Sequence, residues 1–423
     1  HLCDRRQRQM CIRDRYIQRA ITPILKQRVS TSKCMLLVGA RQVGKSTLIK
    51  HEFQDFNRAN FDDRLTRMQA KEEPKLFFLN NPQPLFIDEV QKESSILEDI
   101  KQIADESDER GMFILSGSQK LELMKGMSES LAGRVSISEL TGLSMREIYG
   151  VKFNRHFIPT DAYIKEREKE IVKYDNIWEI IHKGSYPELY DIDRDWQEYY
   201  SSYVATYLER DINELVAADG ITFTKFLTAV AARTGELLNY SNIAGDVGVS
   251  EPTIKNWISI LERTGIVYLL QPYSASALKR AIKTPKLYFR DTGLACYLTR
   301  WLTADTLKCS AVAGNMFETF VVSEILKSYS NEGKDYRFNI FYYRGKDRNA
   351  SGENEIDLVI EEDGVLYPVE IKMSGNPKAS MGATNQVLDK VSDKKRGLGV
   401  ILCLIDKKTY LRENLVALPI EFI

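Results

Sequence analysis

GARQVGKST, residues 39–47, directly follows the apolar run CMLLV, residues 34–38, and this stretch decides the fold. The apolar run predicts a buried strand. The two glycines let the next backbone segment wrap with its N–H groups pointing inward, and a helix expected from Thr47 onward directs its positive end at the same space. The pattern G-x-x-x-x-G-K-S between a strand and a helix therefore predicts a phosphate-binding loop rather than a chance glycine-rich turn.

The side chains of this loop have distinct expected roles. Lys45 is expected to reach the β- and γ-phosphates of a nucleotide, and the hydroxyl of Ser46 is expected to bind Mg²⁺. ATP and Mg²⁺ are therefore the expected cofactors. The candidate nucleotide-binding residues are Gly39, Ala40, Arg41, Gln42, Val43, Gly44, Lys45, Ser46 and Thr47.

A second apolar run, residues 84–87, ends in Asp88 and Glu89. After a phosphate loop, such a pair is placed to hold Mg²⁺ and to activate water. We expect Asp88 to bind Mg²⁺ through water, and Glu89 to orient and deprotonate the attacking water. The alternative, two carboxylates on a solvated turn, is disfavoured by the preceding loop.

A third apolar run, residues 112–115, ends in the polar sequence SGSQ, and we favour Ser118 there as a sensor of the γ-phosphate. The three runs predict a parallel sheet with helices between the strands, which binds ligands at the carboxyl ends of its strands. Arg134 follows Gly133 further along. It is either an ordinary surface residue or an arginine finger that acts in cis or from a neighbouring subunit.

Composition limits the remaining choices. A length of 423 residues predicts about two to four domains, and an apolar fraction of 43% excludes a mainly disordered chain. Lys plus Arg and Asp plus Glu both number 59, so the whole chain has no net attraction to nucleic acid or membrane. No window holds the ~18 consecutive apolar residues of a membrane helix. Six scattered cysteines favour a reducing cytoplasm.

The first fifteen residues, HLCDRRQRQMCIRDR, are Arg-rich and show no helical or strand periodicity. They lack the apolar stretch of a signal peptide. We expect residues 1–15 to be a non-native remnant, with a natural disordered basic arm as the alternative, and we leave them out of the fold prediction.

Residues 222–290 predict a helix over 223–232, a second from Ser241, and a third over 251–263 that Ser250 caps. Strands over 266–270 and 287–289 follow. Helix–turn–helix plus a two-stranded ribbon is a winged-helix pattern.

The charge of this segment suggests a partner. It carries nine Lys or Arg and four acids, so its net charge is +5. A basic wing on a neutral chain favours contacts with DNA phosphates, although winged helices also serve as packing modules. The candidate DNA contacts are Lys255, Lys279, Arg280, Lys283 and Lys286.

The C-terminal segment predicts a second site. A helix from Gly314 has one apolar face, formed by Phe317, Phe320, Val321 and Ile325. Strands over 355–360 and 365–372 flank the hairpin signal Asp363-Gly364.

Glu370 and Lys372 share one face of the second of these strands, and Asp357 on the paired strand is placed to join them. Asp357 and Glu370 are thus candidate Mg²⁺ ligands, and with Lys372 they are candidate catalytic residues for phosphodiester cleavage. The alternative is a charged sheet edge.

Taken together, these motifs resemble bacterial and archaeal AAA-type P-loop ATPases that carry a C-terminal domain of unknown function on a restriction-endonuclease-like core. The resemblance runs from Tyr16 to Ile423. Its motifs are GARQVGKSTL (39–48), FIDEVQ (86–91), LSGSQ (115–119), SLAGR (130–134), TYLERD (206–211), LYFRDTGL (287–294) and EID…VEIK (355–372).

The resemblance implies an α/β protein with several domains and supplies no known substrate. The expected segments are a non-native or disordered tail (1–15), an AAA-type P-loop ATPase domain (16–150), a helical region (151–221), a winged-helix domain (222–290) and a PD-(D/E)XK nuclease-like domain (291–423).

Two function classes stay open. The first is an ATP-hydrolysing enzyme coupled to a nuclease-like domain that acts on, or is regulated by, nucleic acid. The second is a nucleotide-switched DNA-binding regulator or interaction protein whose end domain does not cleave. Both hydrolyse ATP, and both are compatible with a homo-oligomer in the cytoplasm. Mg²⁺-dependent nicking that Asp357→Ala abolishes would separate them.

Overall fold

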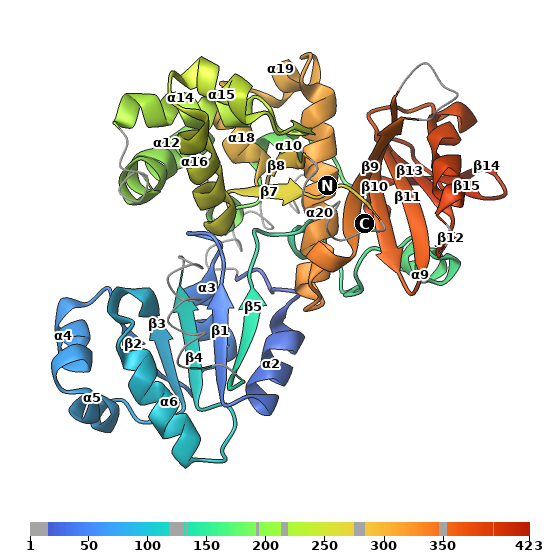
Figure 1. Ribbon diagram of the computed structural model, residues 1–423. Coiled ribbons are helices and arrows are strands. Elements are labelled where there is room, and N and C mark those ends of the chain that lie inside the picture. Colours follow the sequence, from blue (N-terminus) through green and yellow to red (C-terminus); the bar gives the residue numbers. More distant parts are fainter. Residues whose placement is uncertain are drawn as a thin grey trace, which may run out of the picture.

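The computed structural model describes residues 16–117, 131, 133–191, 194–212, 219–274, 284–346, 353–391 and 393–423. Figure 1 shows an N-terminal sheet with its helices in blue and cyan, a mostly helical middle part in green, yellow and light orange, and a C-terminal sheet in orange and red. The helix α20 (Ala313–Asn331) lies between these parts.

The N-terminal sheet has five parallel strands in the order β2-β3-β4-β1-β5. The three runs predicted as strands form β1, β3 and β4, whose residues are all buried, so the expected parallel sheet is confirmed. The strands are β1 (Cys34–Val38), β2 (Asn57–Asn60), β3 (Leu85–Asp88), β4 (Phe113–Gly117) and β5 (Val135–Glu139). The helices are α2 (Thr22–Thr31), α3 (Lys45–Glu52), α4 (Arg64–Glu72), α5 (Pro74–Asn80) and α6 (Ile96–Glu106), with the short η1 (Val90–Glu93).

The middle part begins with short helices and ends in a compact helical group on a small antiparallel sheet of order β6-β8-β7. The first set comprises α8 (Met145–Ile148), α9 (Asp161–Arg167), η2 (Glu168–Glu170), α10 (Ile177–Lys183), α11 (Glu188–Asp191), α12 (Trp196–Tyr203) and η3 (Val204–Ile212). The second set comprises α14 (Gly220–Ala231), β6 (Glu236–Leu237), α15 (Tyr240–Val247), α16 (Glu251–Arg263), β7 (Val267–Leu270), β8 (Lys286–Phe289), α18 (Thr292–Leu298) and α19 (Ala304–Lys308).

The helix predicted over 251–263 is confirmed to the residue as α16, and the Ser250 side chain caps it by accepting a hydrogen bond from the backbone of Thr253. The second helix differs slightly, because Asn239 rather than Ser241 is its cap. The ribbon also has a third, two-residue strand, β6, which was not predicted.

The C-terminal part is a mixed sheet of seven strands. Its path is β14-β15-β13-β11-β10-β9, and β12 pairs with β11. The predicted hairpin is confirmed: Asp363 and Gly364 both have positive φ, at 48° and 77°, as a tight turn between β10 and β11 requires. The elements are β9 (Ile340–Lys346), β10 (Glu353–Glu362), β11 (Val365–Lys372), β12 (Lys395–Arg396), β13 (Gly399–Cys403), β14 (Thr409–Arg412) and β15 (Leu415–Pro419), with η4 (Tyr336–Phe338), η5 (Ala379–Lys390) and η6 (Ile420–Phe422).

Helix α20 is buried on more sides than its apolar pattern predicted. Phe317, Phe320, Val321 and Ile325 are buried as expected, but so are polar residues elsewhere on the helix. These polar side chains bond to segments from other parts of the chain, as described below. Within the described ranges, no helix is long and apolar enough to cross a membrane.

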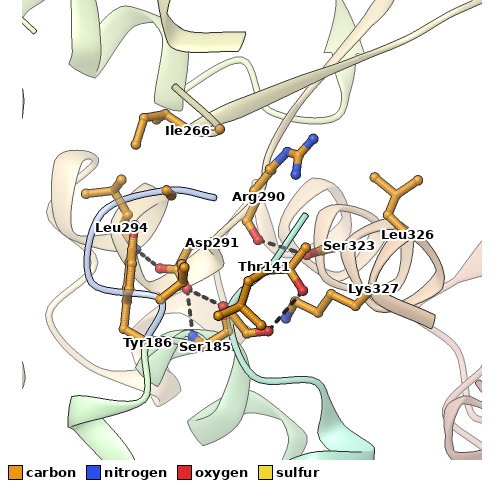
Figure 2. A pocket seen from close by; sticks show the side chains of 15 residues that line it. Thr141, Ser185, Tyr186, Ile266, Arg290, Asp291, Leu294, Ser323, Leu326 and Lys327 are labelled. Carbon is orange, nitrogen blue, oxygen red and sulfur yellow. Dashed lines mark hydrogen bonds between the residues drawn. The ribbon is translucent and has the colours of Figure 1, made fainter. Parts of the chain in front are cut away.

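Asp291, at the start of α18, joins three segments of the middle part by hydrogen bonds. Its Oδ2 accepts hydrogen bonds from the backbone N–H and the hydroxyl of Ser185, at 2.6 and 2.8 Å. Its Oδ1 accepts from the Tyr200 hydroxyl and from the backbone of Leu294, both at 2.7 Å. Figure 2 shows Asp291 between Ser185 and Leu294, at the junction with α20.

Asp291→Ala should therefore lower the free energy of unfolding by about 2–4 kcal/mol, because it leaves several buried donors without an acceptor. Urea unfolding of the variant and of Asp305→Ala, an exposed acid in the first turn of α19, checks this. The control should stay within about 0.5 kcal/mol of the parent protein. Equal effects of the two substitutions would contradict the assignment.

Candidate functional site

The loop of residues 39–47 lies at the carboxyl end of β1, near the centre of the parallel sheet. Helix α3 begins at Lys45, two residues earlier than expected, so residues 45–47 form its first turn. Gly44 has a φ of +93°, in the left-handed region that favours glycine, and the non-glycine Gln42 also has a positive φ, of 65°. Backbone held in such conformations is characteristic of ligand-binding loops.

Lys45 lies folded against its own loop. Its Nζ donates to the carbonyl oxygens of Gly39 and Ala40, both at 2.9 Å, and the residue is 6% exposed. Burial lowers the pKa of Lys45 to about 8, although the carboxylates of Glu89 and Asp88 act in the opposite direction. A buried ammonium is stabilised by an adjacent anion, so the loop is suited to a phosphate group.

Asp88 and Glu89 lie where the sequence predicted, at the end of β3. The hydroxyl of Ser116 on β4 donates to the Asp88 carboxylate, and Gln91 Nε2 donates to the Glu89 carboxylate. Glu89 has a positive φ of 53°. The structure thus brings Lys45, Asp88 and Glu89 together. The sequence did not indicate Ser116, although it belongs to the same SGSQ run from which Ser118 was chosen.

A cavity of about 390 Å³ lies beside this loop, within the size range of small-molecule sites. Its walls come from the loop, from the N-terminal segment, from Glu89, from Leu143 and from α11 with the preceding Pro187. They are formed by Tyr16, Ile17, Arg19, Arg41, Gln42, Gly44, Lys45, Ser46, Thr47, Glu89, Leu143, Pro187, Glu188 and Asp191. The buried ammonium of Lys45 suits the phosphates of ATP. The oxygen atoms of Ser46 and Asp88 are of the type that binds Mg²⁺.

Arg134 requires a correction. It immediately precedes β5, and its carbonyl oxygen accepts a hydrogen bond from the backbone of Cys34 at the start of β1. It therefore lies at the amino ends of the parallel strands, whereas the loop lies at their carboxyl ends. There its Nη2 is 3.1 Å from Asp105 Oδ2. An arginine finger acting in cis is wrong for this geometry, and one from a neighbouring subunit stays a prediction. Ser118 lies outside the described residues.

The three predicted C-terminal residues do converge. Lys372 Nζ is 2.8 Å from Asp357 Oδ2 and 2.8 Å from Glu370 Oε2. Burial and the Asp357 carboxylate raise the pKa of Glu370 to about 8. Burial opposes the charged form of Lys372, yet Asp357 and Glu370 together raise the pKa of its ammonium above the usual value.

The cluster is larger than predicted. Glu318 of α20 lies 3.2 Å from the Nζ of Lys286 and accepts a hydrogen bond from Tyr288 at 2.6 Å. Burial and Asp357 raise the pKa of Glu318. Lys286 also pairs with Glu355 at 2.6 Å. Glu318 was missed because its position on a predicted helix does not reveal which strand it faces.

Lys286 is accordingly not the exposed DNA contact that was expected. It is 4% exposed, and its two carboxylate partners keep its ammonium inside the protein. Lys255 is exposed, but it pairs with Glu251 at 2.8 Å and lies over the ring of Tyr240. The remaining candidates, Lys279, Arg280 and Lys283, lie outside the described residues.

The predicted metal site at Asp357 and Glu370 has a cation of its own, the ammonium of Lys372. In the part of the chain that the structure describes, no group of three or more His, Cys, Asp or Glu side chains is arranged to hold a metal ion.

Comparison with known families divides the chain in the same order as the fold. Residues 31–149 match an AAA domain. Residues 174–305 match a domain of unknown function, DUF8612, and residues 313–423 match another, DUF4143. The chain therefore contains an AAA-type P-loop ATPase domain, which generally binds ATP and Mg²⁺, followed by two domains of unknown function.

Relatives over most of the length are uncharacterized proteins. One from Mycobacterium tuberculosis and one from Mycobacterium bovis are each 26% identical over 375 residues, which cover 86% of this chain and 76% of theirs. Among solved structures, a Walker-type ATPase of Pyrococcus abyssi is 14% identical, with a TM-score of 0.42 over 66% of this chain and 94% of its own. RuvB of Thermotoga maritima is 15% identical, with a TM-score of 0.25 over 59% and 85%.

Removal of the Lys372 ammonium tests whether Asp357 and Glu370 can bind a divalent metal ion. Lys372→Met should lower the free energy of unfolding by about 2 kcal/mol without divalent metal, because two buried carboxylates lose their shared cation. Millimolar Mn²⁺ should restore most of the loss, since carboxylate oxygens are suitable ligands.

The matched control for this test is Lys394→Met, which removes an ion pair with Glu361 on the same strand, β10. Its thermal unfolding should not respond to Mn²⁺. A Lys372→Met protein that is equally insensitive to Mn²⁺ would show that the carboxylates cannot hold a divalent ion.

Proposed function

We propose that this chain is an ATPase that binds ATP with Mg²⁺ in the loop of residues 39–47 and hydrolyses it. The observation that carries the proposal is a buried Lys45 that lines one cavity together with Ser46 and Glu89 and lies close enough to Asp88 to feel its charge. The match of residues 31–149 to an AAA domain supports the same reaction.

Each of these residues has a role in the proposed reaction. The loop N–H groups and Lys45 bind phosphate oxygens, and Ser46 and Asp88 would hold Mg²⁺, which when bound neutralises phosphate charge. Ser116 holds the Asp88 carboxylate in place. Glu89 accepts a proton from the attacking water, and the amide of Gln91 orients its carboxylate.

The domain assignments beyond the ATPase core are also proposals. We assign residues 16–150 to the ATPase domain, 151–221 to a helical region, 222–290 to a winged helix and 291–423 to a restriction-endonuclease-like domain. Three helices with a small antiparallel sheet support the winged helix. The burial of Lys286 favours its use as a packing module over DNA contact.

A second candidate function is Mg²⁺-dependent phosphodiester cleavage by the C-terminal domain. Its support is the 2.8 Å contacts of Lys372 with both Asp357 and Glu370, in the spacing D-x₁₂-E-x-K. The alternative is a nucleotide-switched regulator that keeps this fold without cleaving. The ammonium held between the carboxylates favours an activity that is absent or conditional.

Glu89→Gln should bind ATP with parent affinity and hydrolyse it about 10²–10³-fold more slowly, because the attacking water loses its base. Lys45→Ala should instead weaken nucleotide binding itself. Phosphate release and fluorescent-nucleotide titration separate these effects, with the exposed Glu98→Gln as control. Parent turnover in Glu89→Gln would remove Glu89 from the catalytic role.

For the second candidate, supercoiled and single-stranded DNA are incubated with the protein and Mg²⁺, with and without ATP. The control is Asp389→Ala, which replaces an exposed acid beside the same sheet. A nuclease is supported if the parent protein and this control cut DNA and Asp357→Ala does not. Intact DNA in every lane, with ATP still hydrolysed, would favour the regulator.

A further inference from the structure

Helix α20 contacts both the C-terminal cluster and the segment that follows the ATPase sheet. Near its start, Glu318 belongs to the C-terminal cluster through Lys286 and Tyr288. Six residues later, about 9 Å along the helix axis, Glu324 faces the segment that leaves the ATPase sheet. One rigid element therefore spans the distance between the carboxylate cluster and the ATPase domain.

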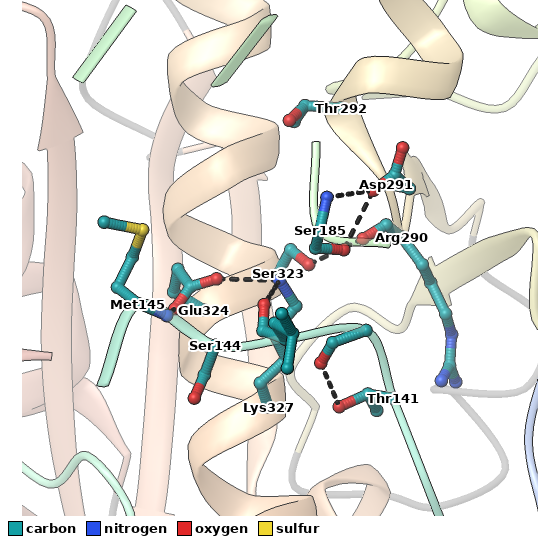
Figure 3. Close-up of polar contacts among 12 residues, drawn as sticks. Thr141, Ser144, Met145, Ser185, Arg290, Asp291, Thr292, Ser323, Glu324 and Lys327 are labelled. Carbon is teal, nitrogen blue, oxygen red and sulfur yellow. Dashed lines mark hydrogen bonds and ion pairs between the residues drawn. The ribbon is translucent and has the colours of Figure 1, made fainter. Parts of the chain in front are cut away.

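Glu324 and Lys327 bind that segment through one backbone N–H group and one backbone carbonyl group. Glu324 Oε2 accepts from the backbone N–H of Met145 at 2.8 Å, and Lys327 Nζ donates to the carbonyl oxygen of Leu143 at 3.0 Å. The two side chains pair with each other at 2.7 Å. Figure 3 shows Glu324 reaching Met145 beside the helix. Both are about 5% exposed, so water screens these contacts little.

The same segment is tied to the phosphate loop through Arg19. Ser144 and Glu147 form the capping box of α8, and the other oxygen of Glu147 is 3.0 Å from Arg19 Nε. Arg19 Nη1 donates to the carbonyl of Val43, inside the loop, at 2.8 Å. Its Nη2 donates to Thr141 at 2.6 Å. Arg19 also lines the cavity beside the loop.

A second connection runs in parallel. Ser323 of α20 donates to the backbone carbonyl of Arg290 at 2.8 Å, and the guanidinium of Arg290 is 2.7 Å from Glu139 at the end of β5. Figures 2 and 3 both place Ser323 beside Arg290. Helix α20 is thus fixed to the carboxyl end of the ATPase sheet at two points.

We propose that nucleotide occupancy of the loop is transmitted to the carboxylate cluster through Arg19, Glu147 and the Glu324–Lys327 pair, which together set the position of α20. The proposal rests on the proposed nucleotide site and adds its regulatory target. In this proposal, phosphate bound in the loop shifts the carbonyl of Val43, and the buried Arg19, which donates to that carbonyl, shifts with it. The shift passes to α8 and then to α20, which carries Glu318.

This coupling differs from mere structural support in one measurable respect. A purely structural contact stabilises the protein equally with and without nucleotide. A coupled contact differs in strength between the nucleotide-free and the nucleotide-bound state, so the helix responds to nucleotide. If nucleotide binding shifts the position of α20, a substitution that shifts α20 must in turn change the affinity for nucleotide.

Hydrogen–deuterium exchange of the full chain tests the proposal, with and without Mg²⁺ and adenylyl imidodiphosphate. In the parent protein, nucleotide should slow exchange about fivefold or more in residues 39–52, and also in 313–331 and 353–372. In the double variant Glu324→Gln, Lys327→Met, the slowing at 39–52 should persist while the response of 313–331 and 353–372 disappears. The control Glu251→Gln, Lys255→Met removes an exposed helical ion pair and should behave as the parent does.

The outcomes separate the two claims. No protection at 39–52 in the parent protein would overturn the proposed nucleotide site, and the coupling with it. Protection at 39–52 without any response at 313–331 would overturn the coupling alone, and this arm needs no variant to fold. A full response at 313–331 in a folded double variant would overturn the route through Glu324 and Lys327.

Discussion

The structure depends on one constraint: α20 is a buried helix that carries charged and polar side chains on several of its faces, and each of these needs a partner. Its hydrogen-bond partners come from the segment after the ATPase sheet and from the middle part. Lys327 bonds to the carbonyl of Leu143, Ser328 accepts from the backbone of Phe157, and Thr319 meets Thr234. Satisfying these groups fixes the ATPase sheet and the middle part to α20, and the apolar residues of α20 share one hydrophobic core with the C-terminal sheet.

This arrangement connects two candidate sites of different chemistry through one helix. The phosphate loop lies at the carboxyl end of β1, and the segment that follows β5 passes directly from that end of the sheet to α20. The C-terminal cluster lies near the start of the same helix, where Glu318 forms an ion pair with Lys286. Neither site is complete within its own part, because Pro187 of the middle part helps to line the cavity and Lys286 of the middle part enters the cluster.

Local pattern was enough to predict several of the elements, and spacing was enough to predict which acids and lysines would lie together. Uniformly apolar runs predicted β1, β3 and β4, and cap and stop residues predicted α16. What could not be predicted depends on partners distant in sequence. Arg19 lies 128 residues from Glu147, and Glu324 lies 179 residues from Met145. The same reason accounts for Lys286 and Arg134, whose charges predicted solvent or ligand contacts but whose partners are carboxylates of this chain.

The central claim is that the loop of residues 39–47 is a nucleotide site within this chain. Calorimetric titration of the purified full chain with Mg²⁺ and an ATP analogue that cannot be cleaved tests it most directly. The account predicts saturable binding of one nucleotide per chain, which becomes weaker when Lys45 is replaced by Ala. Absence of binding, or binding that Lys45→Ala leaves unchanged, would contradict it.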